Sequence, residues 1–94
     1  MPRIERTVTI SNKMGLHARP STKISEVANQ YSCDVQLTKE GLTVDAKSVL
    51  ELLMLAAECG SQVIIAADGE QAEEAVVAIS ELIESKFGEL DVDQ

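Results

Sequence analysis

The sequence has few aromatic residues and few cysteines, and each shortage argues against a class of function. Tyr31 and Phe87 are the only aromatic residues, so stacking on bases or sugars is not the expected mode of recognition. Cys33 and Cys59 lie far apart without CxxC spacing, and His17 is the single histidine, which argues against a zinc or redox site. We therefore expect no metal and no cofactor, and we expect both cysteines to be small packing residues in the core.

The chain also has little positive charge and no long apolar run. Its 94 residues include 8 Lys and Arg against 16 Asp and Glu, a net charge of −8, which disfavours nucleic acid and anionic membrane as partners. Apolar runs fall far short of the roughly 20 residues of a membrane span. The charged start Met-Pro-Arg-Ile-Glu-Arg is unlike a signal peptide. We expect a cytoplasmic protein that meets other protein surfaces.

The hydrophobic content is sufficient for one core. With 45% hydrophobic residues, residues 1–94 are predicted to form a single domain, with a frayed acidic tail at 89–94. Residues 1–47 carry seven basic and five acidic side chains, a net +2, whereas residues 48–94 carry one and eleven, a net −10. An anion-binding site is therefore expected in the first half.

Hydrophobic periodicity predicts seven elements. Alternation predicts strands over residues 3–10, 34–38, 42–44 and 63–67, with Gly41 at positive φ between the second and third. Helical spacing predicts three helices, over residues 18–31, 48–60 and 70–88. The order βαββαβα predicts an α+β fold in which helices cover one face of a largely antiparallel four-stranded sheet.

His17 lies where the first strand gives way to the first helix. Pro20 is tolerated in a first turn because the first N–H groups of a helix have no intrahelical acceptor. If His17 is the N-cap, its ring lies near the N–H groups of Ala18 and Arg19 and the Arg19 guanidinium, a setting that binds phosphate. A histidine with an arginine suffices for a covalent phosphoryl carrier, whereas a hydrolase needs a further orienting carboxylate.

Two stretches of the sequence resemble one known family. Residues 12–20, Asn-Lys-Met-Gly-Leu-His-Ala-Arg-Pro, resemble the active-site signature of HPr, the histidine-containing phosphocarrier family of the bacterial phosphoenolpyruvate-dependent phosphotransferase system. Ala46-Lys47-Ser48 is similar to that family's regulatory serine region. The resemblance extends over nearly the whole chain and implies an open-faced β-sandwich, in which three helices cover one face of a four-stranded antiparallel sheet.

The resemblance implies a covalent carrier rather than a turnover enzyme. His17 is expected to accept phosphate from enzyme I through Nδ1 and to pass it to an enzyme IIA domain, while Arg19 and the backbone at Ala18 and Arg19 steady the phosphoryl group. Ser21 stands where a small apolar residue is usual in the family, and we expect it to add a hydrogen bond near the phosphate. Residues 52–57 also look like the nitrogen-related branch, so the sugar and nitrogen-related branches both stay open.

Ser48 has two interpretations. Ser48-Val-Leu-Glu51 is a capping-box pattern, so the hydroxyl is expected to cap the second helix. The family resemblance implies regulatory phosphorylation of the same hydroxyl by an HPr kinase/phosphorylase. A phosphate there adds about two negative charges at the positive end of a helix dipole, where they are tolerated.

The second predicted helix is apolar almost all round. A helix in a domain this small cannot bury every face, so an exposed apolar surface is expected, and such surfaces bind partners. The predicted docking residues, which the resemblance also assigns to partners, are Met14, Thr22, Val49, Leu50 and Leu53. We expect a monomer, with burial of this helix in a homodimer as the alternative.

Two hypotheses of other classes remain open at this point. One is a small regulatory domain with a ferredoxin-like βαββαβ order, in which residues 15–19 hold an anion without covalent chemistry. In that case the anion site would survive replacement of His17 by Gln. The other is a dimeric scaffold built on the second helix, for which His17 is dispensable.

Overall fold

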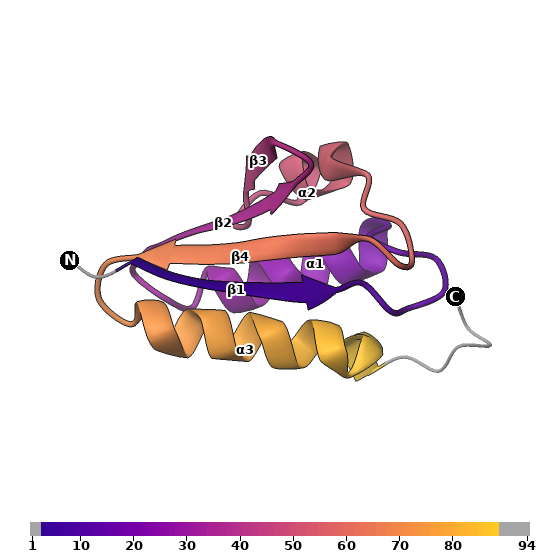
Figure 1. Cartoon of the computed structure of the whole chain (residues 1–94). Helices are drawn as coiled ribbons and strands as arrows, with labels where there is room; N and C mark the ends of the chain where they lie inside the picture. Colours follow the sequence, from indigo (N-terminus) through magenta and orange to yellow (C-terminus); the bar gives the residue numbers. More distant parts are fainter. Residues whose placement is uncertain (1–2, 89–94) are drawn as a thin grey trace.

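The computed structural model describes residues 3–88, and within them four strands form one antiparallel sheet (Figure 1). In sheet order the strands are β1 (Arg3–Thr9), β4 (Gln62–Asp68), β2 (Asp34–Lys39) and β3 (Leu42–Asp45). The helices are α1 (Ala18–Ala28), α2 (Val49–Leu55) and α3 (Ala72–Glu84), followed by a 3-10 turn, η1 (Lys86–Gly88). The tail at 89–94, predicted to be frayed, lies outside the described residues.

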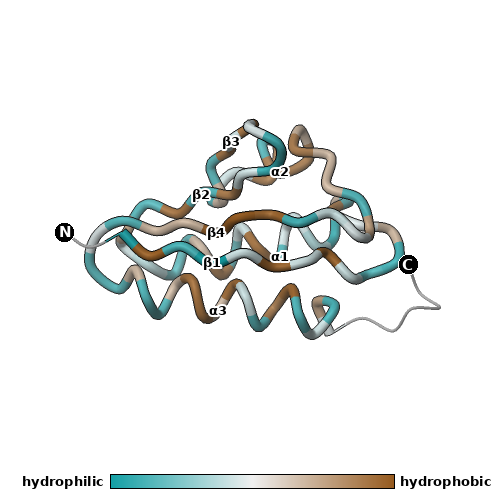
Figure 2. Tube along the Cα trace, viewed as in Figure 1, coloured by the Kyte–Doolittle hydropathy of each residue, from teal (hydrophilic) through white to brown (hydrophobic). Residues whose placement is uncertain are grey.

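The predicted open-faced β-sandwich is confirmed. α3 packs against β1 and β4, α2 packs against β3 and β2, and α1 lies beside the other two helices. Alternate strand residues are buried towards the helices, whereas Ile64 on the opposite face is 38% exposed. Figure 2 shows the matching alternation of apolar and polar residues along the strands and along α3. The alternation that predicted the strands is therefore the inward and outward alternation of one covered sheet.

The hairpin between β2 and β3 follows the prediction. Gly41 has φ +86, as expected, and Glu40 before it also has a positive φ of 50°. Two successive residues at positive φ are the requirement of the tight turn that matches the right-handed twist of a hairpin. The register pairs Lys39 with Leu42 across this turn.

Two predicted helix ends are wrong. α1 ends at Ala28, and Tyr31 is half-buried in the turn that follows. α3 ends at Glu84 rather than Gly88, because Lys86 and Phe87 adopt left-handed conformations (φ 58° and 60°), and Phe87 is only 1% exposed in the core. In both places an apolar residue beyond the helix packs on the core, so the apolar spacing continues after the helix has ended.

The predicted end of α2 near Gly60 is also wrong. The helix ends at Leu55, because Ala56 takes a left-handed conformation (φ 53°, ψ 43°). The carbonyl oxygen of the next residue, Ala57, then accepts the Leu16 N–H at 2.8 Å. The segment after α2 pairs with the loop before α1 instead of continuing the helix. This tertiary contact overrides local helix propensity.

Candidate functional site

His17 is the N-cap residue of α1, as predicted. Its backbone is extended (φ −96°, ψ −166°), its side chain makes no capping hydrogen bond, and the residue is half-buried. The Nε2 atom of the ring is buried and has no hydrogen-bond partner among residues 3–88. A buried Nε2 is not accessible to a partner protein.

The first turn of α1 forms an anion-binding helix terminus beside His17. Pro20 has no N–H, and the Ser21 N–H donates to the His17 carbonyl oxygen at 3.0 Å. By helix geometry the N–H groups of the first turn, here those of Ala18 and Arg19, precede the first intrahelical hydrogen bond. Both residues are exposed. These amides, the positive end of the helix dipole and the Arg19 guanidinium together favour a phosphoryl group on the neighbouring ring.

The loop that leads into His17 is fixed against the segment after α2. Besides the hydrogen bond from Leu16 to Ala57, Gly15 (φ +69°) packs so closely that a Cβ atom there would lie 2.5 Å from the Ala57 carbonyl oxygen and 2.9 Å from the Glu58 Cα. Both the backbone conformation and the space therefore require glycine. The loop before His17 therefore packs directly against the backbone of residues 57–58.

Ser48 caps α2, as predicted. Its Oγ accepts the Glu51 N–H at 3.2 Å. The Glu51 carboxylate does not complete the reciprocal box but accepts the Asp45 N–H at 2.9 Å. Ser48 is half-buried, and its hydroxyl lies at the N-terminus of a helix that carries the apolar surface described below.

The residue before Ser48 is held by the C-terminal part of α1. The Lys47 carbonyl oxygen accepts hydrogen bonds from Ser25 Oγ (2.8 Å) and Asn29 Nδ2 (3.1 Å). The Lys47 ammonium group donates to the Tyr31 carbonyl oxygen at 2.9 Å. α1 therefore connects the two predicted sites, with His17 at its N-terminus and the Ser48 cap braced near its C-terminus.

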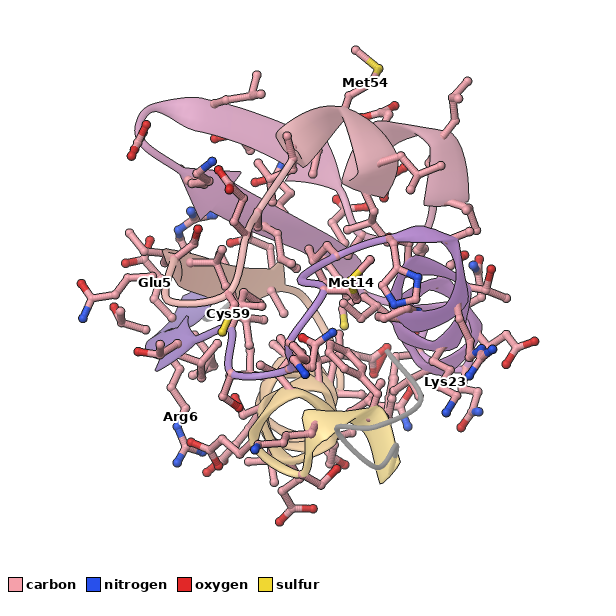
Figure 3. All side chains as sticks on the ribbon, turned by 90° about the vertical axis from the view of Figure 1, so that its right-hand side faces the viewer. Glu5, Arg6, Met14, Lys23, Met54 and Cys59 are labelled. Carbon is pink, nitrogen blue, oxygen red and sulfur yellow. The ribbon has the colours of Figure 1, made fainter. Side chains whose placement is uncertain are left out.

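Exposed apolar side chains lie on α2 and on the loop that leads into α1, as expected. Met14 is 57% exposed, Leu50 70% and Leu53 39%, and Thr22 is exposed, whereas Val49 is half-buried. Met54, which the sequence analysis did not select, is 65% exposed. Figure 3 shows Met54 projecting from α2 and Met14 on the loop that leads into α1. We call Met14, Leu50, Leu53 and Met54 the apolar surface.

Two expectations about single residues are wrong. Ser21 is fully buried, and its Oγ has no partner among the described residues. It shares the inward stripe of α1 with the buried Ile24 and Ala28 and therefore cannot reach a phosphoryl group. Cys33 is buried as expected, but Cys59 is exposed in the loop after α2, with its Sγ 3.9 Å from the Ser11 carbonyl oxygen.

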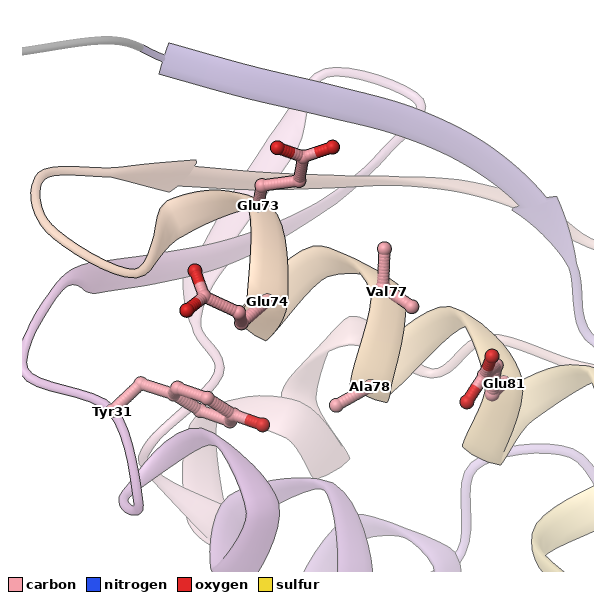
Figure 4. Close-up of a pocket in the computed structure, with 6 residues that line it drawn as sticks. All are labelled: Tyr31, Glu73, Glu74, Val77, Ala78 and Glu81. Carbon is pink, nitrogen blue, oxygen red and sulfur yellow. The ribbon is translucent and has the colours of Figure 1, made fainter.

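A hollow of about 370 Å³ lies at the other end of α1, beside α3. An aromatic ring, three carboxylates and small apolar groups line it, from Tyr31, Glu73, Glu74, Val77, Ala78 and Glu81 (Figure 4). Three carboxylates repel a phosphoryl group, so this hollow does not suit the predicted chemistry. Within residues 3–88, no group of three or more His, Cys, Asp or Glu is placed to hold a metal ion. In the same part of the chain, no helix is long and apolar enough to cross a membrane.

Comparison with known proteins decides the family. Residues 4–85 match the family model described as "PTS HPr component phosphorylation site". The chain belongs to the HPr family. It is 43% identical over 86 residues to phosphocarrier protein HPr of Cupriavidus necator, covering 92% of this chain and 97% of that protein. It is 38% identical over 89 residues to phosphocarrier protein NPr of Shewanella violacea, covering 95% and 98%.

The HPr fold is confirmed by a solved relative. The crystal structure of HPr from Thermoanaerobacter tengcongensis matches with a TM-score of 0.89 at 40% identity, covering 93% of this chain and 98% of that one. This match favours the HPr fold over the ferredoxin-like alternative. Family membership makes the chain a phosphocarrier protein of the phosphotransferase system.

Proposed function

We propose that His17 is the residue that carries the phosphoryl group in this HPr-family chain, with Arg19 and the backbone N–H groups of Ala18 and Arg19 stabilising it. The observation that carries the proposal is the position of His17 at the N-cap of α1, with Nε2 buried. This position supports Nδ1 as the attacking atom, with the phosphoryl oxygens next to the helix terminus.

The transfer exchanges one P–N bond for another. The neutral His17 ring attacks phosphorus through the Nδ1 lone pair, while the bond between phosphorus and the donor histidine of enzyme I breaks and that imidazole keeps the electron pair. Delivery to a histidine on an enzyme IIA domain is the same exchange in the other direction. The carrier returns to its starting state without a net reaction of its own, so we classify it as a carrier and not as an enzyme.

The proposal includes the partners and the setting. Enzyme I is the donor and enzyme IIA domains are the acceptors, and both dock on Thr22, Val49 and the apolar surface. An HPr kinase/phosphorylase modifies Ser48. Residues 1–94 act as one cytoplasmic carrier domain, which works as a monomer. The exposure of the apolar surface beside the loop that holds His17 supports this arrangement.

Intact-protein mass tests the central step. The chain is incubated with enzyme I, Mg²⁺ and phosphoenolpyruvate, alongside the variants His17→Ala and Arg19→Ala. We expect one acid-labile phosphoryl group on the wild type, none on His17→Ala, and slower phosphorylation of Arg19→Ala because the phosphoryl charge is less stabilised. A second HPr-family carrier in the same reaction shows that enzyme I is active.

Either of two results would contradict the proposal. Phosphate on His17→Ala would place the acceptor elsewhere. No phosphate on the wild type, with enzyme I active, would favour the noncovalent anion site, and phosphate binding that persists in His17→Gln would establish it.

A further inference from the structure

Asn12 is a fully buried polar side chain in the loop before His17. Its Nδ2 donates to the Gly15 carbonyl oxygen at 2.8 Å. The backbone of the same two residues is also joined, because the Gly15 N–H donates to the Asn12 carbonyl oxygen at 3.1 Å. Asn12 and Gly15 therefore close a turn through two separate hydrogen bonds, one of which depends on the asparagine side chain.

The Gly15 carbonyl oxygen connects this turn to His17. It accepts the Asn12 amide and also the His17 N–H, at 3.0 Å. A carbonyl oxygen has two lone pairs, and here two donors use them. The orientation of this carbonyl fixes the backbone at His17, and Asn12 fixes the orientation of the carbonyl.

Within residues 3–88, no capping hydrogen bond and no partner of Nε2 hold the His17 ring in place. The direction in which Nδ1 points is therefore set by the backbone of His17 and by the packing around the ring. Phosphoryl transfer depends on an in-line approach, so a small rotation of this backbone displaces the attacking atom.

We propose that Asn12 is a positioning residue for phosphoryl transfer at His17. Its side-chain amide holds the Gly15 carbonyl, which in turn holds the His17 N–H and directs Nδ1 at the phosphorus atom. Asn12 is buried and does not touch a partner, so its effect is on the rate of transfer and not on docking. This inference rests on the proposed role of His17 as the acceptor.

The test uses Asn12→Ala and the isosteric Asn12→Asp. Alanine has no side-chain donor, and an ionised aspartate only accepts hydrogen bonds, so both variants lose the N–H donor. Initial rates of transfer from phosphorylated enzyme I are measured while the concentration of the chain is varied. We expect kcat to fall about tenfold or more in both variants, since small misplacements of reacting groups are costly. We expect KM to change less than twofold, because the apolar surface is intact.

A second readout reports on the loop itself. In both variants, amide hydrogen exchange at His17 and Gly15 is expected to become faster than the loss of global stability explains, while exchange in β4 follows global stability. Ile79→Val, a core substitution in α3, is the matched control. It lowers stability without touching the loop, and its kcat is expected to equal that of the wild type at a temperature where all variants are folded.

The outcomes separate this inference from the proposed function. Transfer that persists in His17→Ala would remove the proposed acceptor, whatever Asn12 does. Transfer through His17 with an unchanged kcat in the Asn12 variants would overturn the positioning role alone. Equal loss of kcat in Ile79→Val, a rise confined to KM, or failure of both Asn12 variants to fold would make Asn12 a purely structural residue and would also overturn it.

Discussion

Gly15 has the tightest backbone contact described for any glycine of the chain, and it lies two residues before His17. The substitution Gly15→Ala places a Cβ 2.5 Å from the Ala57 carbonyl oxygen at a φ of +69°. The left-handed conformation costs about 1–2 kcal/mol for alanine, and the overpacking adds about 1–3 kcal/mol. We expect a loss of about 2–5 kcal/mol in the free energy of unfolding, measured by urea denaturation.

Gly41→Ala is the matched control for this prediction. Gly41 has a similar φ of +86°, but a Cβ there meets nothing within 4 Å. Only the conformational cost of about 1–2 kcal/mol is expected. Equal destabilisation by the two substitutions would show that the contact between Gly15 and Ala57 does not constrain the loop.

At the level of single residues, the sequence predicts the place of residues whose side-chain chemistry is rare in the chain. His17 is the only histidine and precedes Ala-Arg-Pro, so its place at a helix N-terminus follows from local rules. The sequence does not predict a role for Asn12, because its partner, the Gly15 carbonyl, is a backbone group that any residue has. The sequence also does not predict the exposure of Cys59, because that exposure depends on where α2 ends, which the tertiary contact of Ala57 decides.

Among the elements, α2 depends most on its cap, because it has only 7 residues. Ser48→Ala removes the acceptor of the Glu51 N–H, and we expect a loss of about 1 kcal/mol in the free energy of unfolding. Ser48→Asp keeps an acceptor at the positive end of the dipole and is expected to restore most of this loss. Urea denaturation of both variants measures the difference.

Ser85→Ala serves as the control for the cap. The Ser85 hydroxyl donates to the Leu82 carbonyl oxygen at 3.0 Å, so it satisfies no helix N–H, and a smaller loss is expected. If Ser48→Asp were as unstable as Ser48→Ala, the cap would contribute nothing as an acceptor. Phosphate on Ser48 would then also lose the support that we expect from the helix terminus.

The type and order of the elements are predictable from the sequence, whereas their ends are less so. The short apolar run Val63–Ala67 predicts a central strand, and β4 does lie between β1 and β2. The predicted C-terminal ends of α2 and α3 are wrong where residues other than glycine take a left-handed conformation, as Ala56, Lys86 and Phe87 do. Local propensity disfavours that conformation, and the contacts that impose it come from distant parts of the chain.

For the whole molecule, the apolar surface is the proposed route of partner recognition. Leu53 is 39% exposed and Val77, on the outer face of α3, is 38% exposed. We expect Leu53→Ser to raise KM for enzyme I about fivefold, equivalent to about 1 kcal/mol of binding. Val77→Ser removes a similar apolar group far from His17, and KM is expected to stay unchanged. Steady-state transfer kinetics measure both.

Parallel increases in KM for the two serine variants would show that partners do not distinguish the α2 face from the α3 face. Sedimentation of the wild type and Leu53→Ser over a range of concentrations adds a second check. A wild type whose size grows with concentration, and a variant whose size does not, would favour the homodimer as the occupant of the apolar surface.

The location of His17 at one end of α1 determines whether two partners can bind at the same time. The accessible surface of the structure is 5048 Å², and a stable complex covers about 800 Å² on each side. Two patches of that size, both centred on one imidazole, overlap. Under the proposed function the donor must leave before the acceptor arrives, so the exchange is ping-pong. Residence time then limits flux, and short-lived complexes serve the carrier better than tight ones.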